Sequence, residues 1–301
     1  MQIILLYVVI VLIWGSTWST IPYQLGIVAE EVSVGYRFGL AAITLYGYAL
    51  SSGRQIRLPT HAYPVVLLQG TLMFCLAYFF VYYGAGRLAS GLVAVLFTSI
   101  VLANAAFERI FFRTPFEPRI VSAALLGAAG MTMIFWPEVS VISLEDDTVV
   151  GILLVFIGVL LASLGNMAAV VNTRRSLPVV AVNAHSMAWA AALSLAIAYA
   201  LGREFLFPLR LSYVLSLGYL SIFGSAVAFG AYLALIRHIG SARAAYTSVL
   251  YPLVALGIST LFEEYRWTVI AALGLVLTLA GNWLILRRRG EMKRTVRGTE
   301  L

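Results

Sequence analysis

Long apolar stretches alternate with short charged or polar segments along almost the whole chain. Each stretch is about 20 residues long, the length that a helix needs to cross the hydrocarbon core of a membrane. The pattern predicts ten membrane-spanning helices, namely Ile3–Pro22, Val32–Ser52, Ala62–Gly84, Leu88–Phe107, Ile120–Trp136, Val149–Asn172, Val179–Leu201, Leu211–Ile236, Ala244–Phe262 and Trp267–Leu286. We therefore expect an all-α membrane protein.

The composition agrees with this pattern. Hydrophobic residues make up 61% of the 301 residues and charged residues 11%, whereas a soluble domain carries about 25% charged residues. The net charge of +7 does not indicate a nucleic-acid partner, because most basic residues lie between apolar stretches or in the C-terminal tail. The single cysteine, Cys75, predicts neither an intramolecular disulfide nor a metal site, and no cofactor is expected.

Two stretches resemble each other closely. Leu88–Glu108 and Ala244–Glu263 are both rich in small apolar residues and both end in Phe-Glu. Each is followed by a short polar link and a second apolar helix that carries late glycines, which are Gly127 and Gly130 in one copy and Gly274 and Gly281 in the other. We interpret this as one half-molecule that has been duplicated.

The midpoint of the chain lies between the fifth and sixth predicted helices. Because five is odd, the second half must start on the side opposite the first, and the halves form an inverted repeat. We expect a first repeat over residues 1–137, a periplasmic linker over 138–148, a second repeat over 149–288 and a basic cytoplasmic tail over 289–301. In inverted-repeat carriers the solute site lies between the repeats, near the membrane midplane.

Arginine and lysine set the expected orientation. Fifteen of these residues lie in one set of loops and the tail, and four lie in the opposite loops. The positive-inside rule places the richer side, with both termini, in the cytoplasm of a multi-pass inner-membrane protein. The first apolar stretch lacks a basic leading segment and stays free of charge as far as Ala29, so we expect a retained helix rather than a cleaved signal peptide.

Three motifs occur in a characteristic order. Trp14-Gly15-Ser16-Thr17-Trp18 lies in the first span, Tyr36-Arg37-Phe38 followed by Ala41-Ala42 in the second, and Phe107-Glu108-Arg109 at the end of the fourth. Together they resemble the EamA-like family of the drug/metabolite transporter superfamily. The resemblance covers nearly the whole chain as two five-helix EamA domains, and it implies a carrier of small organic solutes.

Aromatic and amide side chains inside the spans are candidates for lining a solute cavity. Trp14 and Trp18 are four residues apart and share a helix face, and Tyr78 lies in the third span. Asn104, Asn166, Tyr246 and Tyr251 are polar groups in the fourth, sixth and ninth spans. For all of them the alternative is packing or hydrogen bonding between helices, and for Asn166 this is strengthened by Gly158 and Ala162 on its face.

Four ionisable residues are candidates for a proton or structural switch. Arg37 lies within reach of a membrane boundary, and we expect it to bind helix-end carbonyls more readily than solute. His185 has a side chain able to carry a proton, although a lone histidine is more often a satisfied core residue. Glu108 and Glu263 lie at helix ends, and no carboxylate is expected at the midplane.

The sequence lacks enzyme signatures such as His-Glu-x-x-His, Gly-x-Ser-x-Gly or a phosphate-binding loop. A carrier is therefore favoured over a membrane enzyme or a structural membrane protein. The expected solutes are amino acids or related amphipathic metabolites, moved outward, with uptake as the alternative. The fifth and tenth helices carry mainly Leu, Ala and Gly, so we expect them at the periphery, where they pack against neighbours or form a homodimer.

Overall fold

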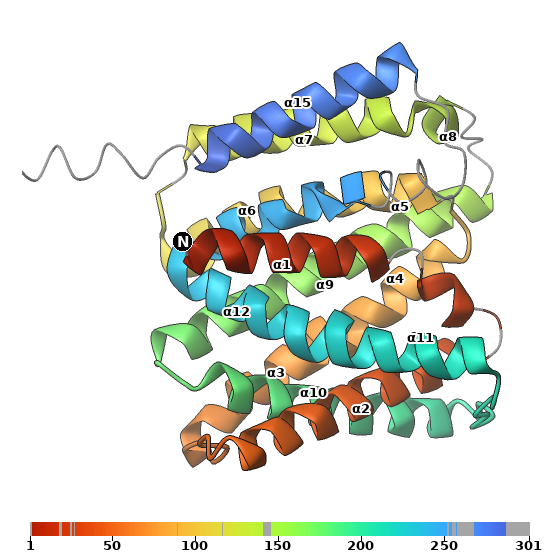
Figure 1. The fold of residues 1–301 in the computed structure, drawn as a ribbon, viewed down its shortest axis with the longest axis vertical. Coiled ribbons are helices and arrows are strands. Elements are labelled where there is room, and N and C mark those ends of the chain that lie inside the picture. The colour runs from red at the N-terminus through yellow and green to blue at the C-terminus, as the bar shows by residue number, and fades with distance from the viewer. Residues whose placement is uncertain are drawn as a thin grey trace, which may run out of the picture.

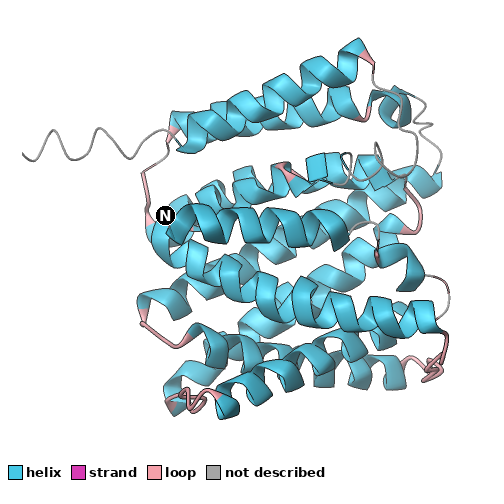
Figure 2. Ribbon diagram, in the orientation of Figure 1, coloured by secondary structure: helices cyan, strands magenta, loops and turns pink. Residues whose placement is uncertain are grey.

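The computed structural model describes residues 2–17, 20–24, 26, 28–88, 90–115, 117–140, 146–251, 253–254, 257 and 268–286. Every regular element within these residues is a helix (Figure 2). Five of the helices are long and apolar enough to cross a membrane, and three shorter ones are similarly apolar. The described helices follow the ten predicted spans, so the fold is an all-α bundle of two repeats.

The first half holds the first five spans. The first two are α1 (Gln2–Thr17) and α2 (Glu30–Ser51), joined through the 3₁₀ turn η1 (Ile21–Gln24). The third consists of η2 (Thr60–Ala62), α3 (Tyr63–Gln69), the π-helical segment η3 (Gly70–Leu76) and α4 (Ala77–Ala85). The fourth consists of α5 (Ser90–Phe97) and α6 (Ile100–Phe112), and the fifth is α7 (Pro118–Ile134), followed by the short α8 (Trp136–Ser140).

The second half repeats this order. It begins with α9 (Asp146–Arg174) and α10 (Val179–Ala200), and the eighth span consists of α11 (Leu211–Ser221), the π-helical segment η4 (Ile222–Val227) and α12 (Ala228–Ile239). The ninth begins with α13 (Ser241–Ala245) and η5 (Tyr246–Val249), and the tenth is α15 (Val269–Leu286). Most of the ninth span after Tyr251 lies outside the described residues.

Several element boundaries differ from the sequence pattern by a few residues; α6, for example, ends at Phe112 rather than Phe107. The first helix ends at Thr17 rather than continuing to Pro22, and the chain turns instead through η1. Helix α9 begins at Asp146, inside the segment predicted as a linker. These differences arise because hydropathy reports which residues tolerate lipid, whereas the ends of a helix depend on backbone hydrogen bonds.

Helix packing follows the symmetry of an inverted repeat (Figure 1). Helix α2 packs against α10, and α7 against α15, so the second and fifth spans each contact their own counterparts. The first span contacts the eighth through α1 and α12, and the third contacts the sixth through α4 and α9. The first span corresponds to the sixth, and the eighth to the third. A two-fold relation between the halves therefore converts the contact between spans one and eight into the contact between spans six and three.

Helices α7 and α15 form a separate layer at the top of Figure 1. Their axes approach closely because glycines face each other, and a Cβ on Gly130 would collide with the backbone of Gly274. The outer side of α15 exposes Val269, Val276 and Trp283. This pair is therefore peripheral, and its apolar outer side is suited to contact with lipid.

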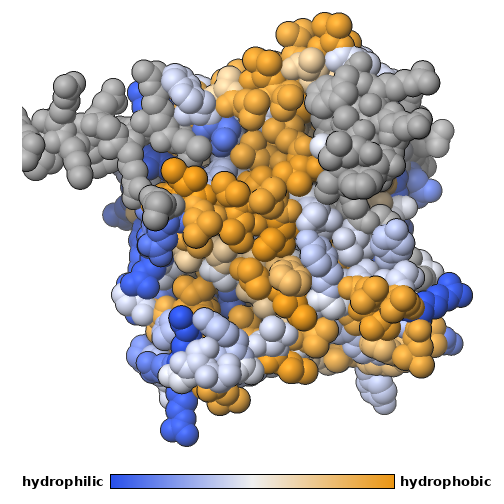
Figure 3. All heavy atoms as spheres, in the orientation of Figure 1, coloured by the Kyte–Doolittle hydropathy of each residue, from blue (hydrophilic) through white to orange (hydrophobic). Residues whose placement is uncertain are grey.

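Hydrophobic side chains form a band across the middle of the face in Figure 3, with hydrophilic side chains at both ends of the helices. We call the end that carries the N-terminus the basic end, because the loops there hold Arg54, Arg57, Arg113, Arg174 and Arg175. The helices run between this end and the opposite end. This arrangement is the one expected of helices that cross a bilayer.

Candidate functional site

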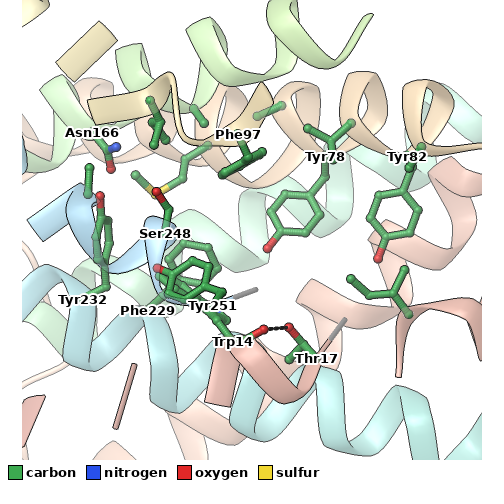
Figure 4. Close-up of a pocket in the computed structure, with 18 of the residues that line it drawn as sticks. Trp14, Thr17, Tyr78, Tyr82, Phe97, Asn166, Phe229, Tyr232, Ser248 and Tyr251 are labelled. Carbon is green, nitrogen blue, oxygen red and sulfur yellow. Dashed lines mark hydrogen bonds between the residues drawn. The ribbon is translucent and has the colours of Figure 1, made fainter. Parts of the chain in front are cut away.

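A cavity of about 170 Å³ lies between the two halves of the bundle (Figure 4). Its lining comes from both repeats, chiefly from α1, α4, α9, α12 and the start of the ninth span. Most of the lining is apolar or aromatic, and it comprises Trp14, Thr17, Ile21, Arg37, Met73, Ala77, Tyr78, Val81, Tyr82, Ala85, Phe97, Ile100, Ala162, Asn166, Phe229, Tyr232, Ala245, Ser248 and Tyr251. The volume resembles that of a cavity of about 150 Å³ that admits benzene.

Trp14 forms one wall of the cavity. Its indole nitrogen donates a 2.8 Å hydrogen bond to the carbonyl of Gly224 in η4. Its ring lies edge-on to Phe229, at 4.8 Å between centroids, and to Tyr251, at 5.3 Å. The first, eighth and ninth spans therefore hold one aromatic wall in a fixed geometry.

Arg37 of α2 supplies the charge in the lining. Its Nε donates to Ser225 Oγ of η4 at 2.9 Å, and its Nη1 donates to the hydroxyl of Tyr82 at 3.2 Å. The guanidinium carbon also lies 5.1 Å from the ring centroid of Tyr78, a cation–π geometry. The expected bonds to helix-end carbonyls are not the ones formed, because this face of α2 turns into the bundle and buries the side chain.

Asn166 of α9 lies near the other end of the labelled side chains from Tyr82 (Figure 4). Its Nδ2 donates to Oδ1 of Asn104 at 3.2 Å, and Ser163 Oγ donates to the same oxygen at 2.6 Å. The Oδ1 of Asn166 and the Oγ of Ser248 are buried without a hydrogen-bond partner among the described residues. Both atoms belong to residues that line the cavity.

A second polar network joins the halves between the cavity and the basic end. Asn104 Nδ2 donates to the carbonyl of Ser241 at 3.1 Å. Glu108 Oε1 accepts from the backbone N–H of Ser241 at 2.8 Å and from its hydroxyl at 2.6 Å. Glu108, near the C-terminal end of α6, thus caps the first residue of α13 in the other repeat.

Several sequence candidates lie away from the cavity. Tyr246 is fully buried and donates to the carbonyl of Ala123 in α7 at 2.8 Å, so it joins the peripheral pair to the bundle instead of lining the cavity. Asn104 does not line the cavity, and it is connected to the lining through its hydrogen bond with Asn166. His185 contacts the hydroxyl of Tyr46 at 2.7 Å and the carbonyl of Ile56 at 3.0 Å, which makes it a satisfied core residue.

The structure therefore brings Trp14, Tyr78, Asn166, Tyr251 and Arg37 together around one cavity. Trp18 and Glu263 lie outside the described residues. The sequence analysis did not single out Phe229, Tyr232 or Ser225. Helices α5 and α13 begin at Ser90 and Ser241 in the two repeats, and the same offset aligns Tyr78 with Phe229.

Comparison with known proteins gives this architecture a family. Residues 1–136 and 148–287 each match the EamA-like transporter family. The chain belongs to the EamA-like transporter family. The two matched segments correspond to the two halves of the bundle, and their boundaries lie close to those that the repeat predicts.

Individual relatives agree with this assignment. The chain is 28% identical over 282 residues to the uncharacterized inner membrane transporter YedA of Escherichia coli (strain K12), covering 91% of this chain and 89% of that protein, and equally to YedA of Escherichia coli O157:H7. A crystal structure with 19% identity superposes with a TM-score of 0.77 over 95% of this chain and 98% of the other, which shows a shared fold. This EamA-like chain is thus a multi-pass membrane transporter, not an enzyme.

Proposed function

We propose that the chain is a secondary transporter that exports small amphipathic organic solutes, such as amino acids or related metabolites, across the inner membrane by alternating access. The observation that carries the proposal is the cavity between the two repeats, lined by aromatic groups from both. In inverted-repeat carriers, rocking of one repeat against the other exposes a fixed site to either side in turn. The inner-membrane location is proposed from the similarity to YedA, an inner membrane transporter.

The lining supports an amphipathic solute. Aromatic rings of Trp14, Phe229 and Tyr251 offer an apolar surface, while Arg37 and Asn166 offer one charge and one amide group. Ligand sites commonly combine a mainly apolar lining with a few placed polar groups. A strongly polar solute would lose hydration over most of this surface without compensation.

A resistance screen tests the function and its direction. Cells that overproduce the protein are challenged with a panel of amino acids and toxic analogues, beside cells that produce Asn166→Leu at the same level. Export predicts raised resistance to at least one compound, and this resistance is lost in the variant. Raised sensitivity that depends on Asn166 would reverse the direction to uptake, and an unchanged panel would contradict the function.

The orientation is tested separately, by single cysteines in a Cys75→Ala background. We propose that the basic end faces the cytoplasm, as the arginine distribution predicts. Gly53→Cys and Arg175→Cys should then resist an impermeant thiol reagent in intact cells, whereas Asp146→Cys should react. All three should react in permeabilised cells, and the reverse pattern in intact cells would overturn the orientation.

A further inference from the structure

Helix α2 buries two charged side chains, and the structure treats them differently. Glu31 is 1% exposed, and its carboxylate pairs with Arg203 at 3.3 Å and accepts a hydrogen bond from the Tyr83 hydroxyl. Arg37 is 4% exposed, and no carboxylate among the described residues pairs with it. Glu31 is therefore neutralised within the protein, whereas Arg37 is not.

An unneutralised arginine at this depth requires an explanation. A guanidinium stays protonated in proteins, and an isolated charge inside a membrane is costly enough that such residues usually serve a solute or ion pathway. The hydroxyls of Ser225 and Tyr82 accept two of its five N–H groups. Neither hydroxyl carries a formal charge, so the positive charge itself stays uncompensated.

A glycine packs closely against the guanidinium. A Cβ on Gly224 would lie 3.3 Å from Arg37 Nη2 and 3.0 Å from the methyl carbon of Thr17. Both Arg37 and Thr17 line the cavity. The charge of Arg37 therefore borders the cavity, and the absence of a side chain at Gly224 lets the guanidinium lie where it does.

We propose that Arg37 binds the carboxylate of the transported solute, and that this solute is a small monocarboxylate with an apolar body about the size of one aromatic ring. This inference rests on the proposed function and names the substrate class. Arginine suits the role because its planar fork of donors matches the two oxygens of a carboxylate. A bound carboxylate would neutralise the buried charge that the protein leaves unpaired.

Charge and size favour a monocarboxylate over a phosphate or a cation. Arg37 is the single charged residue in the described lining, so it balances one negative charge and would leave a dianion half compensated. A cationic solute would meet the same charge as a repulsion, with no carboxylate in the described lining to offset it. The remaining lining is largely apolar, and the cavity volume is close to that of one aromatic ring with a short chain.

Three probes with one shared body test this assignment on the purified full chain. They are 3-phenylpropionate, 3-phenylpropanamide and 3-phenylpropylamine, which are an anion, a neutral amide and a cation of similar size. Binding to the protein in detergent is measured by calorimetry and by thermal stabilisation. The acid should bind at least about tenfold more tightly than the amide, and the amine should bind most weakly.

Variants assign the preference to one side chain. Arg37→Gln should bind acid and amide equally, whereas Arg54→Gln should keep the preference, because Arg54 is exposed and stacks on Tyr48 outside the cavity. Tyr82→Phe keeps the charge and removes one hydroxyl, so it should retain most of the preference. Equal binding of acid and amide to the natural chain, no binding of any probe, or a preference that survives Arg37→Gln would each overturn the proposal.

The test remains decisive if Arg37→Gln does not fold, because the comparison of the three probes uses the natural chain. Counterflow of the probes in proteoliposomes separates this inference from the proposed function. Transport of the amide as fast as the acid would remove the carboxylate assignment and leave the carrier. Tight, Arg37-dependent binding of the acid without transport of any probe would leave the anion site and remove the carrier.

Discussion

The two π-helical segments lie in the middle of corresponding spans, yet their surroundings differ. In η3, Gly70 touches the backbone of Ser186 in α10, and Met73 packs against Gly165 in α9. In η4, the carbonyl of Gly224 accepts the indole N–H of Trp14, and Ser225 accepts from Arg37. The first segment thus packs against neighbouring helices and adds Met73 to the cavity lining, whereas the second hydrogen-bonds two other lining residues.

This difference shows how a duplicated fold acquires one site. A π-helical turn is rare and often marks functional positions, and here both repeats keep it. Thr71 and Cys75 of η3 bond to Trp189 and Ser194 of α10, which do not line the cavity. The partners of η4 are Trp14 and Arg37, which do line it. Backbone symmetry has been retained while the chemistry of the two halves has diverged.

The largest expected effect follows from Gly70→Ala. Its new Cβ would meet the backbone carbonyl of Ser186, which cannot rotate away. We expect a loss of about 2–3 kcal/mol in stability, as for an overpacked core, seen as a lower melting temperature in detergent. Gly218→Ala is the matched control, because nothing lies within 4 Å of its Cβ, and equal melting temperatures of the two variants would show that η3 does not pack as described.

Gly224→Ala should act on binding more than on folding. Its Cβ meets the side chains of Thr17 and Arg37 rather than a backbone atom. Arg37 must therefore shift, and we expect affinity for 3-phenylpropionate to fall about tenfold, equivalent to roughly 1.4 kcal/mol. Calorimetry measures the affinity. A melting temperature lowered as far as that of Gly70→Ala would contradict the expectation that Gly224 affects binding more than folding.

Ser225→Ala is expected to have a smaller effect. It removes the acceptor for Arg37 Nε but leaves the bond from Nη1 to Tyr82. A hydrogen bond from a charged donor contributes about 1.5 kcal/mol, but the bond to Tyr82 still holds the guanidinium. Affinity for the acid should therefore fall only about fivefold, while affinity for the amide stays constant. An equal fall for both probes would show a general loss of cavity shape.

The smallest effect is expected from Ser194→Ala, the comparable change at η3. The Ser194 hydroxyl donates to the thiol of Cys75 at 3.3 Å, and sulfur is a weak acceptor. Stability should fall by less than about 1 kcal/mol, and the affinity for 3-phenylpropionate should not change. A loss of affinity here would mean that the bond between η3 and α10 also shapes the solute site.

Much of the fold could be predicted from sequence because membranes impose a length on each span. The two repeats could be predicted from the duplicated Phe-Glu ends and the matched glycines. The family could be predicted from the motifs around Trp14 and Arg37. The direction in which individual side chains point was harder to predict. In spans that are apolar on all sides, periodicity carries little information on which side faces inward.

Arg37 and Tyr246 illustrate what remained hidden. Distance from a helix end indicated that Arg37 would reach the boundary, but the rotation of α2 turns it toward η4. Tyr246 was placed in the cavity by its depth, and yet its hydroxyl fits between Gly127 and Gly281 at the carbonyl of Ala123. The π-helical segments could not be predicted either, because an uninterrupted apolar sequence does not distinguish a π-helical turn from an α-helical turn.

The bonds from Ser241 to Glu108 set a population balance between arrangements of the two halves. They hold only while α6 and α13 stay together. At about 1.5 kcal/mol for each charge-assisted bond, separating the two helices is disfavoured by roughly 3 kcal/mol, or more than about a hundredfold in occupancy. If the proposed alternating access separates these two helices, the solute must bind the separated arrangement more tightly by the same factor, and Glu108 would disfavour movement of the empty carrier.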